Sequence, residues 1–147
     1  MIEIKYKTFD ELTTRELYQI IQLRIEVFVI EQNCPYQDCD DKDLQSMHLM
    51  FWKENKLAAY CRILPPGISY EGYTSIGRVV THPAFRKQAL GKQLMNDAID
   101  RCKHIDPSPI KISAQAYLEK FYQDLGFETI SEPYLEDDIP HIAMVMH

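Results

Sequence analysis

The chain has 147 residues, of which 46% are hydrophobic and 26% charged, and its formal net charge is −6. This length fits one domain, residues 1–147, and the acidic balance excludes a nucleic-acid partner, because such affinity rests on many Lys and Arg contacts to phosphates. No apolar run reaches the roughly 20 residues of a membrane helix, and the N-terminus lacks the apolar stretch of a signal peptide, so we expect a cytoplasmic protein with no membrane partner.

The first half of the chain predicts a strand, a helix and a strand pair. Residues 2–7 alternate like a strand, and apolar residues then recur at helical spacing over residues 14–30, with Thr13 or Thr14 as the N-cap. Residues 34–43 are polar and acidic and predict a loop. The runs 48–53 and 57–64, separated by Glu54-Asn55-Lys56, predict an antiparallel hairpin.

The second half predicts four more strands and two helices. Residues 74–81 read as a strand, and residues 88–105 as a helix with one apolar face. A strand over 110–114 and a helix over 116–125 follow, and Gly126 is placed to end that helix. Residues 127–130 and 142–146 predict the last strands. This order indicates an α/β (α+β mixed sheet) fold, with a central mixed β-sheet flanked by helices.

The four cysteines do not indicate a metal site. Cys34 and Cys39, with His48 downstream, do not have one of the common zinc-ligand spacings. We therefore interpret the cysteines as free thiols and expect no metal.

A basic turn lies between the strand at 74–81 and the helix at 88–105. It carries Arg86, Lys87 and Lys92, and it leads into a helix N-terminus, whose first amides have no partner within the helix. Gly91 lets a phosphate approach the backbone. The pattern is neither a P-loop nor a dinucleotide-binding fingerprint. It indicates a site for a small anion such as a pyrophosphate, with an ordinary polar helix start that binds nothing as the alternative.

The turn and the segment "AQAYLEKFYQDLGFETI" (residues 114–130) together resemble the GNAT N-acetyltransferase family. The family's R/Q-x-x-G-x-G/A turn is matched at Arg86 and Gly91, but Ala89 stands where the family has Gly. The family's N-x-x-A-x-x-F-Y-x-x-x-G-F pattern is matched at Phe121-Tyr122 and Gly126-Phe127, with Gln115 and Leu118 as departures. The segments "LRIEVFVIEQNCPYQDCDDKD", "RILPPG" and "YLEDDIPHIAM" further resemble the ElaA-like branch of that family.

The resemblance implies a GNAT-like acyl-CoA N-acyltransferase fold and an enzyme that transfers acetyl from acetyl-CoA to a primary amine of a small molecule or peptide, by direct attack in a ternary complex. It implies that the backbone of the strand before the turn, with Val80 as the chosen amide donor, pairs with the pantetheine arm and polarises the carbonyl. It also implies that Tyr122 protonates the departing thiolate. The cofactor-binding residues that it implies are Val79, Val80, Thr81, Arg86, Lys87, Gln88, Ala89, Leu90, Gly91, Lys92, Gln115 and Tyr122.

The general base and the acceptor stay open at this level. Glu31, His48 and His141 are base candidates, and Glu31 is the one taken as catalytic. The candidate substrate residues are Arg24, Gln32, His48, Arg62, Arg78 and His141. The acidic residues of the 33–43 and 134–141 loops either attract a cationic amine or are simply solvated, and the arginines either bind a substrate carboxylate or pair with those acids internally.

Two other functions compete with an enzyme. One is an acyl-CoA-binding regulatory module without turnover, which would have no need of a proton donor at Tyr122. The other is a plain structural domain with an incidental basic turn, which predicts no stabilisation by CoA. We expect a monomer or homodimer.

Overall fold

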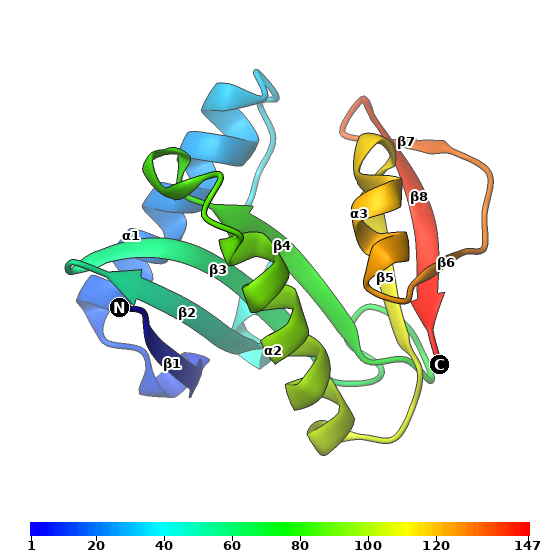
Figure 1. The fold of residues 1–147 in the computed structure, drawn as a ribbon, viewed down its shortest axis with the longest axis horizontal. Helices are drawn as coiled ribbons and strands as arrows, with labels where there is room; N and C mark the ends of the chain where they lie inside the picture. The colour runs from blue at the N-terminus through cyan, green and yellow to red at the C-terminus, as the bar shows by residue number, and fades with distance from the viewer.

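The computed structural model describes residues 1–147 and arranges them as two antiparallel sheets flanked by helices (Figure 1). In the first sheet the strand order is β1 (Glu3–Thr8), β2 (Met47–Lys53), β3 (Lys56–Leu64) and β4 (Ser75–Thr81). In the second sheet, β8 (Ile139–Met146) lies between β5 (Ile110–Gln115) on one edge and the short strands β6 (Glu128–Thr129) and β7 (Tyr134–Glu136) on the other.

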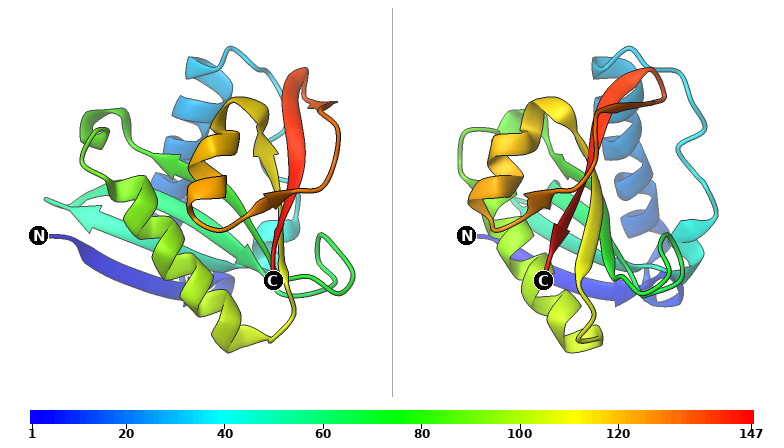
Figure 2. Two further views of the ribbon diagram at one scale, coloured as in Figure 1. Left: turned by 45° about the vertical axis from the view of Figure 1, so that its right-hand side comes forward. Right: turned by 90° about the vertical axis from the view of Figure 1, so that its right-hand side faces the viewer.

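Three α-helices connect the strands, and Figure 2 shows that α1 and α2 cover opposite faces of the first sheet. Their bounds are α1 (Thr14–Arg24), α2 (Leu90–Ile105) and α3 (Glu119–Asp124). Thr13 and Glu16 form a capping box at the start of α1, which satisfies two of its free amides. None of the helices combines the length and the apolar character needed to cross a membrane.

Shorter helical turns complete the chain. The helix α1 runs on into a π-helical segment, η2 (Ile25–Glu31), whose wider turns carry its end to the rim of the molecule. The 3₁₀ turns are η1 (Phe9–Glu11), η3 (Lys42–Gln45), η4 (Pro83–Phe85) and η5 (Ala116–Leu118).

The hydrophobic core has two parts, one on each face of the first sheet. Alternate residues of β3 separate them, because Cys61 and Ile63 point to the α2 side while Tyr60 points to the α1 side. The larger cluster joins β2, β3, α2 and α3 with the inner face of β5 and β8. The smaller cluster packs Ile20 and Leu23 of α1 against the other face. Burial on both faces makes β3 the rigid centre of the fold.

Backbone hydrogen bonds join the two sheets at one place only. Thr74 and Ile110 form one parallel bridge, with Thr74 N–H donating to the Pro109 carbonyl and Lys111 N–H donating to the Thr74 carbonyl. No ladder joins β4 to β5 beyond that bridge, so the predicted mixed sheet has its parallel pairing confined to this contact. The strands diverge from it, as Figure 1 shows for β4 and β5. The divergence leaves one edge of each strand facing a gap.

Several predicted boundaries shift. The predicted helix at 14–30 is α-helical only to Arg24, and the predicted helix at 88–105 begins at Leu90 because Ala89 is left-handed. The strand β7 was not predicted, and the predicted helix at 116–125 begins with the 3₁₀ turn η5. The hairpin between β2 and β3 turns at Glu54 and Asn55, both with positive φ, as a two-residue hairpin loop requires.

Candidate functional site

The gap between β4 and β5 is a cleft of about 830 Å³, which we call the β4–β5 cleft. Its walls come from η2 and the residues after it, from β4 and the start of α2, from β5 and α3, and from the turn between β7 and β8. Segments distant in sequence therefore meet at one place. Of the predicted site residues, those lining the cleft are Glu31, Gln32, Arg62, Arg78, Val79, Val80, Thr81, Arg86, Gly91, Gln115, Tyr122 and His141.

The turn before α2 presents unpaired backbone amides at one end of the cleft. Lys87 and Ala89 both adopt left-handed conformations, with φ of 67° and 60°, and the N-cap of α2 has no side-chain hydrogen bond. The amides of residues 88–92 make no backbone hydrogen bond within the protein. Successive amides exposed by alternating backbone conformations form an anion-binding concavity, and the positive end of the α2 dipole adds to it.

Side chains of the turn divide between this concavity and the core. Leu90 is buried in the larger core cluster, so it offers only its backbone, whereas Lys87 and Lys92 are exposed at the rim. Gln88 accepts a hydrogen bond from Lys53 Nζ at 2.8 Å. A Cβ on Gly91 would lie 3.8 Å from both Phe121 Cζ and Thr81 Oγ1, an ordinary contact. The protein itself therefore does not require glycine at position 91.

Backbone amides of β4 also face the gap, but the amide that was predicted to do so is not among them. The N–H of His82 donates to the Ala58 carbonyl of β3 at 2.8 Å, and amides alternate between the two edges of a strand. Val80 pairs with Tyr60 and turns its amide toward β3, so the prediction that Val80 donates into the cleft is wrong. Val79 and Thr81 direct their amides into the gap. A bulge immediately before them, with Arg78 at φ 51°, sets this orientation.

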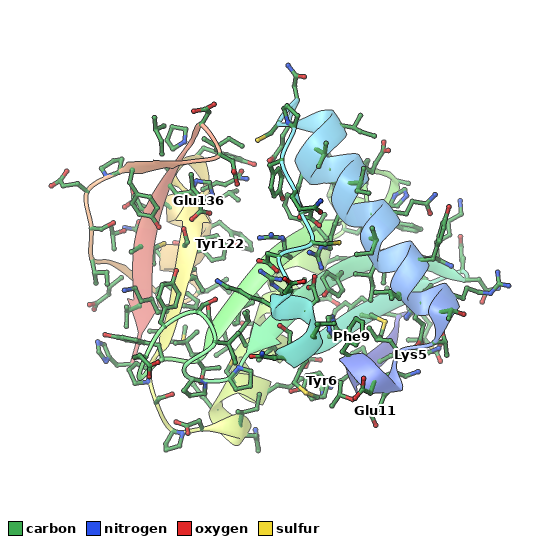
Figure 3. All side chains as sticks on the ribbon, turned by 180° about the vertical axis from the view of Figure 1, so that it is seen from behind. Lys5, Tyr6, Phe9, Glu11, Tyr122 and Glu136 are labelled. Carbon is green, nitrogen blue, oxygen red and sulfur yellow. The ribbon has the colours of Figure 1, made fainter.

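Tyr122 reaches the cleft from α3. Its side chain is 6% exposed and packs edge-on against Phe121 and Phe127. The hydroxyl has no hydrogen-bond partner in the protein, although the residue lines the cleft. Burial raises the pKa of the Tyr122 phenol, so the hydroxyl is protonated at neutral pH. Figure 3 shows Tyr122 on the half of the molecule that carries the second sheet.

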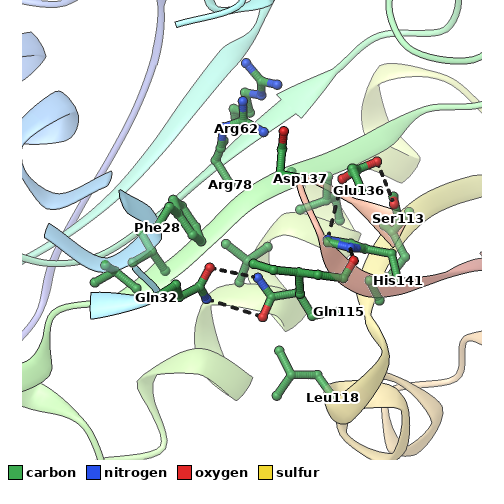
Figure 4. Close-up of a pocket in the computed structure, with 18 of the residues that line it drawn as sticks. Phe28, Gln32, Arg62, Arg78, Ser113, Gln115, Leu118, Glu136, Asp137 and His141 are labelled. Carbon is green, nitrogen blue, oxygen red and sulfur yellow. Dashed lines mark hydrogen bonds and ion pairs between the residues drawn. The ribbon is translucent and has the colours of Figure 1, made fainter. Parts of the chain in front are cut away.

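Two side-chain pairs connect the end of η2 with the far wall. Glu31 binds Arg86 through two hydrogen bonds of 2.6 and 2.8 Å, and Gln32 exchanges amide hydrogen bonds with Gln115 at 3.2 and 3.3 Å. Figure 4 shows the second pair spanning the cleft. Arg86 lowers the pKa of the Glu31 carboxyl, which weakens it as a base. The predicted catalytic role of Glu31 is therefore not favoured.

The predicted substrate arginines form a buried ion network instead of an open carboxylate site. Arg24 is fully buried and binds Asp38 and Asp43, each at 2.7 Å, so it does not reach the cleft. Arg62 binds Asp40 and Asp43, and Arg78 binds Asp38 and Asp40. Internal pairing, one of the two predicted alternatives, is the one that the structure confirms. The network fixes the 33–43 loop against β3 and β4.

His48 is likewise structural. It is 1% exposed, with Nδ1 2.6 Å from the Tyr60 hydroxyl and Nε2 2.9 Å from the Asp43 carbonyl. Burial lowers its pKa, and both of its nitrogens are engaged in the interior, so the prediction of His48 as a substrate residue or base candidate is wrong.

Further polar residues line the cleft beyond the predicted site residues, among them Ser113, Glu136 and Asp137. Ser113 comes from β5, Glu136 from β7 and Asp137 from the turn after it. Ser113 Oγ lies 2.6 Å from the Tyr134 hydroxyl and 3.3 Å from Glu136 Oε1. The acidic run at residues 136–138 was the available signal, but only the hairpin of β7 and β8 turns it into the cleft.

Comparisons with known proteins agree with this architecture. The model of the Acetyltransferase (GNAT) domain family matches residues 13–147. The chain is 45% identical to Protein ElaA of Escherichia coli over 98% of its own length and 95% of that protein's. The crystal structure of E. coli ElaA superposes with a TM-score of 0.93 at 43% identity, with all of both chains covered. An acyl-CoA N-acyltransferase structure from Pseudomonas aeruginosa also gives 0.93, at 46% identity over all of both chains.

Proposed function

The chain belongs to the GNAT acetyltransferase family, and we propose that it is an N-acetyltransferase that moves the acetyl group of acetyl-CoA to a primary amine of a small molecule or peptide. One observation carries this proposal: a turn with free backbone amides and a buried tyrosine whose hydroxyl has no partner line the same cleft. The turn offers hydrogen-bond donors to a pyrophosphate, and the tyrosine hydroxyl offers a proton to a departing thiolate.

The turn suits the pyrophosphate of CoA. The free amides of residues 88–92 and the guanidinium of Arg86 supply donors and positive charge, and Lys87 and Lys92 add charge at the rim. The absence of a side chain at Gly91 allows a phosphate to approach the backbone. The exposed edge of β4, with the amides of Val79 and Thr81, suits the extended amide-bearing pantetheine arm. Acetyl-CoA would supply an activated acetyl thioester at the end of that arm.

Two groups of this chain, a backbone amide and a tyrosine hydroxyl, would then assist the acyl transfer. The Val79 amide would donate to the thioester carbonyl and so stabilise the negative charge that develops on oxygen. The Tyr122 hydroxyl would donate its proton to sulfur as the C–S bond breaks. Burial raises the pKa of the phenol, so the hydroxyl carries its proton at neutral pH.

Turnover separates this proposal from a CoA-binding regulatory module. The experiment measures thiol release from acetyl-CoA in the presence of polyamines, amino acids, aminosugars and peptides, with binding of CoA measured separately. We expect amine-dependent thiol release, and we expect Tyr122→Phe to lower kcat by about 100-fold or more while the affinity for acetyl-CoA stays within about twofold. CoA binding without turnover on any amine would favour the regulatory module, and an unchanged kcat in Tyr122→Phe would remove Tyr122 from the chemistry.

A further inference from the structure

We propose that His141 accepts the proton of the acceptor ammonium and that Glu136 positions it for this role. The inference rests on the proposed function and deepens it, because it names the base and the side from which the amine arrives. Three features support it: the orientation of the ring, its place relative to Tyr122, and the charges around it.

The hydrogen bonds of His141 define which nitrogen is free. Nδ1 lies 2.7 Å from the Ile139 carbonyl oxygen. A carbonyl can only accept, so Nδ1 carries the proton, and in the neutral ring Nε2 keeps its lone pair. Nε2 lies 3.5 Å from Glu136 Oε2, and only 9% of the side chain is exposed. The ring also stacks on Tyr134. The ring is therefore held on two sides, with Nε2 beside the Glu136 carboxylate.

The register of β5 and β8 puts His141 on the opposite face from Tyr122. Ala114 pairs with Ile142, and both side chains belong to the core cluster that contains Tyr122. Gln115 pairs with His141 one residue further along, so both point to the other face. Figure 4 shows His141 beside Gln115 and Glu136 in the cleft. An amine that arrives past His141 and a thiolate that departs toward Tyr122 would approach the gap from opposite sides.

The charges at this end of the cleft favour a protonated amine. Asp137 has no Lys or Arg partner, and the carboxylate of Glu136 has no cationic partner except His141. These two carboxylates attract an ammonium ion, whereas Arg62 and Arg78 are already paired with aspartates, and an ammonium ion must lose a proton before its nitrogen can attack. The titratable groups in contact with the ring are Glu136 and Tyr134, and the charged or titratable groups elsewhere along this end of the cleft are Cys34, Tyr36, Asp40, Lys42, Arg62, Tyr70, Arg78 and Asp137.

The other two base candidates are engaged elsewhere. Glu31 is held by Arg86, and both nitrogens of His48 are hydrogen-bonded in the interior. His141 is the one of the three that lies in the cleft with a ring nitrogen, Nε2, that makes no hydrogen bond within the protein.

The protons and electrons of the reaction balance. His141 Nε2 takes one proton from the ammonium, and the amine lone pair then forms the C–N bond to the acetyl carbon. The C–S bond breaks, and its electron pair stays on sulfur, which takes a proton from Tyr122. The new amide nitrogen gives up a second proton, which returns through solvent to Tyr122. His141 releases its own proton to solvent, so each turnover yields one amide, one thiol and one proton.

The test compares His141→Gln and Glu136→Gln with matched surface controls, His104→Gln and Glu132→Gln, using an amine that the wild-type protein acetylates. We expect His141→Gln to lower kcat/KM for the amine by about 100-fold or more while the affinity for acetyl-CoA is unchanged. Glu136→Gln should lower kcat/KM for the amine by about 10-fold, because His141 loses the carboxylate beside Nε2 that positions it, while the affinity for acetyl-CoA is unchanged; Glu136→Asp, which keeps a carboxylate, should recover part of this loss.

The outcomes are distinguishable. A His141→Gln or a Glu136→Gln variant with wild-type kcat/KM for the amine would overturn the inference while leaving the proposed function intact. Absence of turnover in the wild-type protein on every amine would instead overturn the proposed function. Thermal unfolding and acetyl-CoA affinity report whether each variant folds. Because the Glu136 side chain is 51% exposed, Glu136→Gln keeps the test decisive even if His141→Gln does not fold.

Discussion

Glu31 and Arg86 join the two walls of the β4–β5 cleft at the end where the turn before α2 lies. The carboxylate at the end of η2 makes two hydrogen bonds, of 2.6 and 2.8 Å, to the guanidinium of the turn before α2. Both side chains are about two-fifths exposed. A pyrophosphate that used the same two donors of Arg86 would have to replace Glu31 as its partner, so the ion pair would compete with CoA.

Glu31→Gln tests this competition. An exposed ion pair contributes about 0–1 kcal/mol, so we expect the affinity for acetyl-CoA to stay the same or to rise by up to about fivefold. Because Glu31 is not the proposed base, kcat should stay within about twofold. Calorimetric titration and thiol-release kinetics measure the two quantities, and Glu26→Gln on the exposed side of η2 is the control. A hundredfold loss of kcat would return Glu31 to the role of base.

Ala89→Gly tests the strain in the turn. Ala89 has φ of 60°, a conformation that costs an alanine roughly 1–2 kcal/mol and that glycine adopts freely, although glycine loses more entropy on folding. The net expectation is a gain of up to about 1 kcal/mol in the free energy of unfolding, measured by urea titration. Ala84→Gly, in the neighbouring turn η4 and without a positive φ, should instead lose stability. A loss in both variants would show that Ala89 is not strained.

The ion network of Arg24 predicts sensitivity to acid. Burial alone would raise the pKa of the Asp43 carboxyl, but Arg24 and Arg62 more than offset it and hold the pKa below its ordinary value. A carboxyl of this kind contributes its full stability above the unfolded pKa, about 3.9, and loses it as the pH falls further. Burial lowers the pKa of His48, so protonation of His48 also opposes folding, below a pH of about 6.5.

We therefore expect the free energy of unfolding to fall from pH 7 to pH 3 and to fall less steeply below pH 4 in Asp43→Asn. That variant should also lose about 3–5 kcal/mol at pH 7, because it breaks a buried ion pair from one side. Urea unfolding at several pH values measures both effects, and Asp10→Asn, on the exposed turn η1, is the control. An identical slope in Asp43→Asn and the wild-type protein would contradict the account.

Local patterns predicted much of the fold. The hairpin of β2 and β3 and the amphipathic helix α2 follow from periodicity and turn residues. The strand β7 could not be predicted, because all three of its residues are exposed and its pairing with β8 depends on long-range register. The π-helical end of α1 has the same apolar spacing as an ordinary helix, so nothing in the sequence marks it.

Part of the candidate site could be predicted from two short sequence motifs. Arg86, Gly91 and Tyr122 all line the cleft. Side chains whose role depends on burial were less accessible to sequence reasoning: Arg24 and His48 were expected at the substrate and lie instead in the interior. The direction of a strand amide depends on register and on the bulge at Arg78. Neither can be read from the sequence, so the sequence could not distinguish the amide of Val79 from that of Val80.

Acetyl-CoA titration of the wild-type protein and of Gly91→Ala tests most directly whether the turn before α2 holds the pyrophosphate. The added Cβ would contact the protein at 3.8 Å, and alanine is the better helix former, so the variant should fold with unchanged or higher stability. We expect the wild-type protein to bind one acetyl-CoA per chain and Gly91→Ala to bind it at least tenfold more weakly, while Asn96→Ala on the exposed face of α2 binds like the wild-type protein. Equal affinity in the wild-type protein and Gly91→Ala, or no binding by the wild-type protein, would contradict the account.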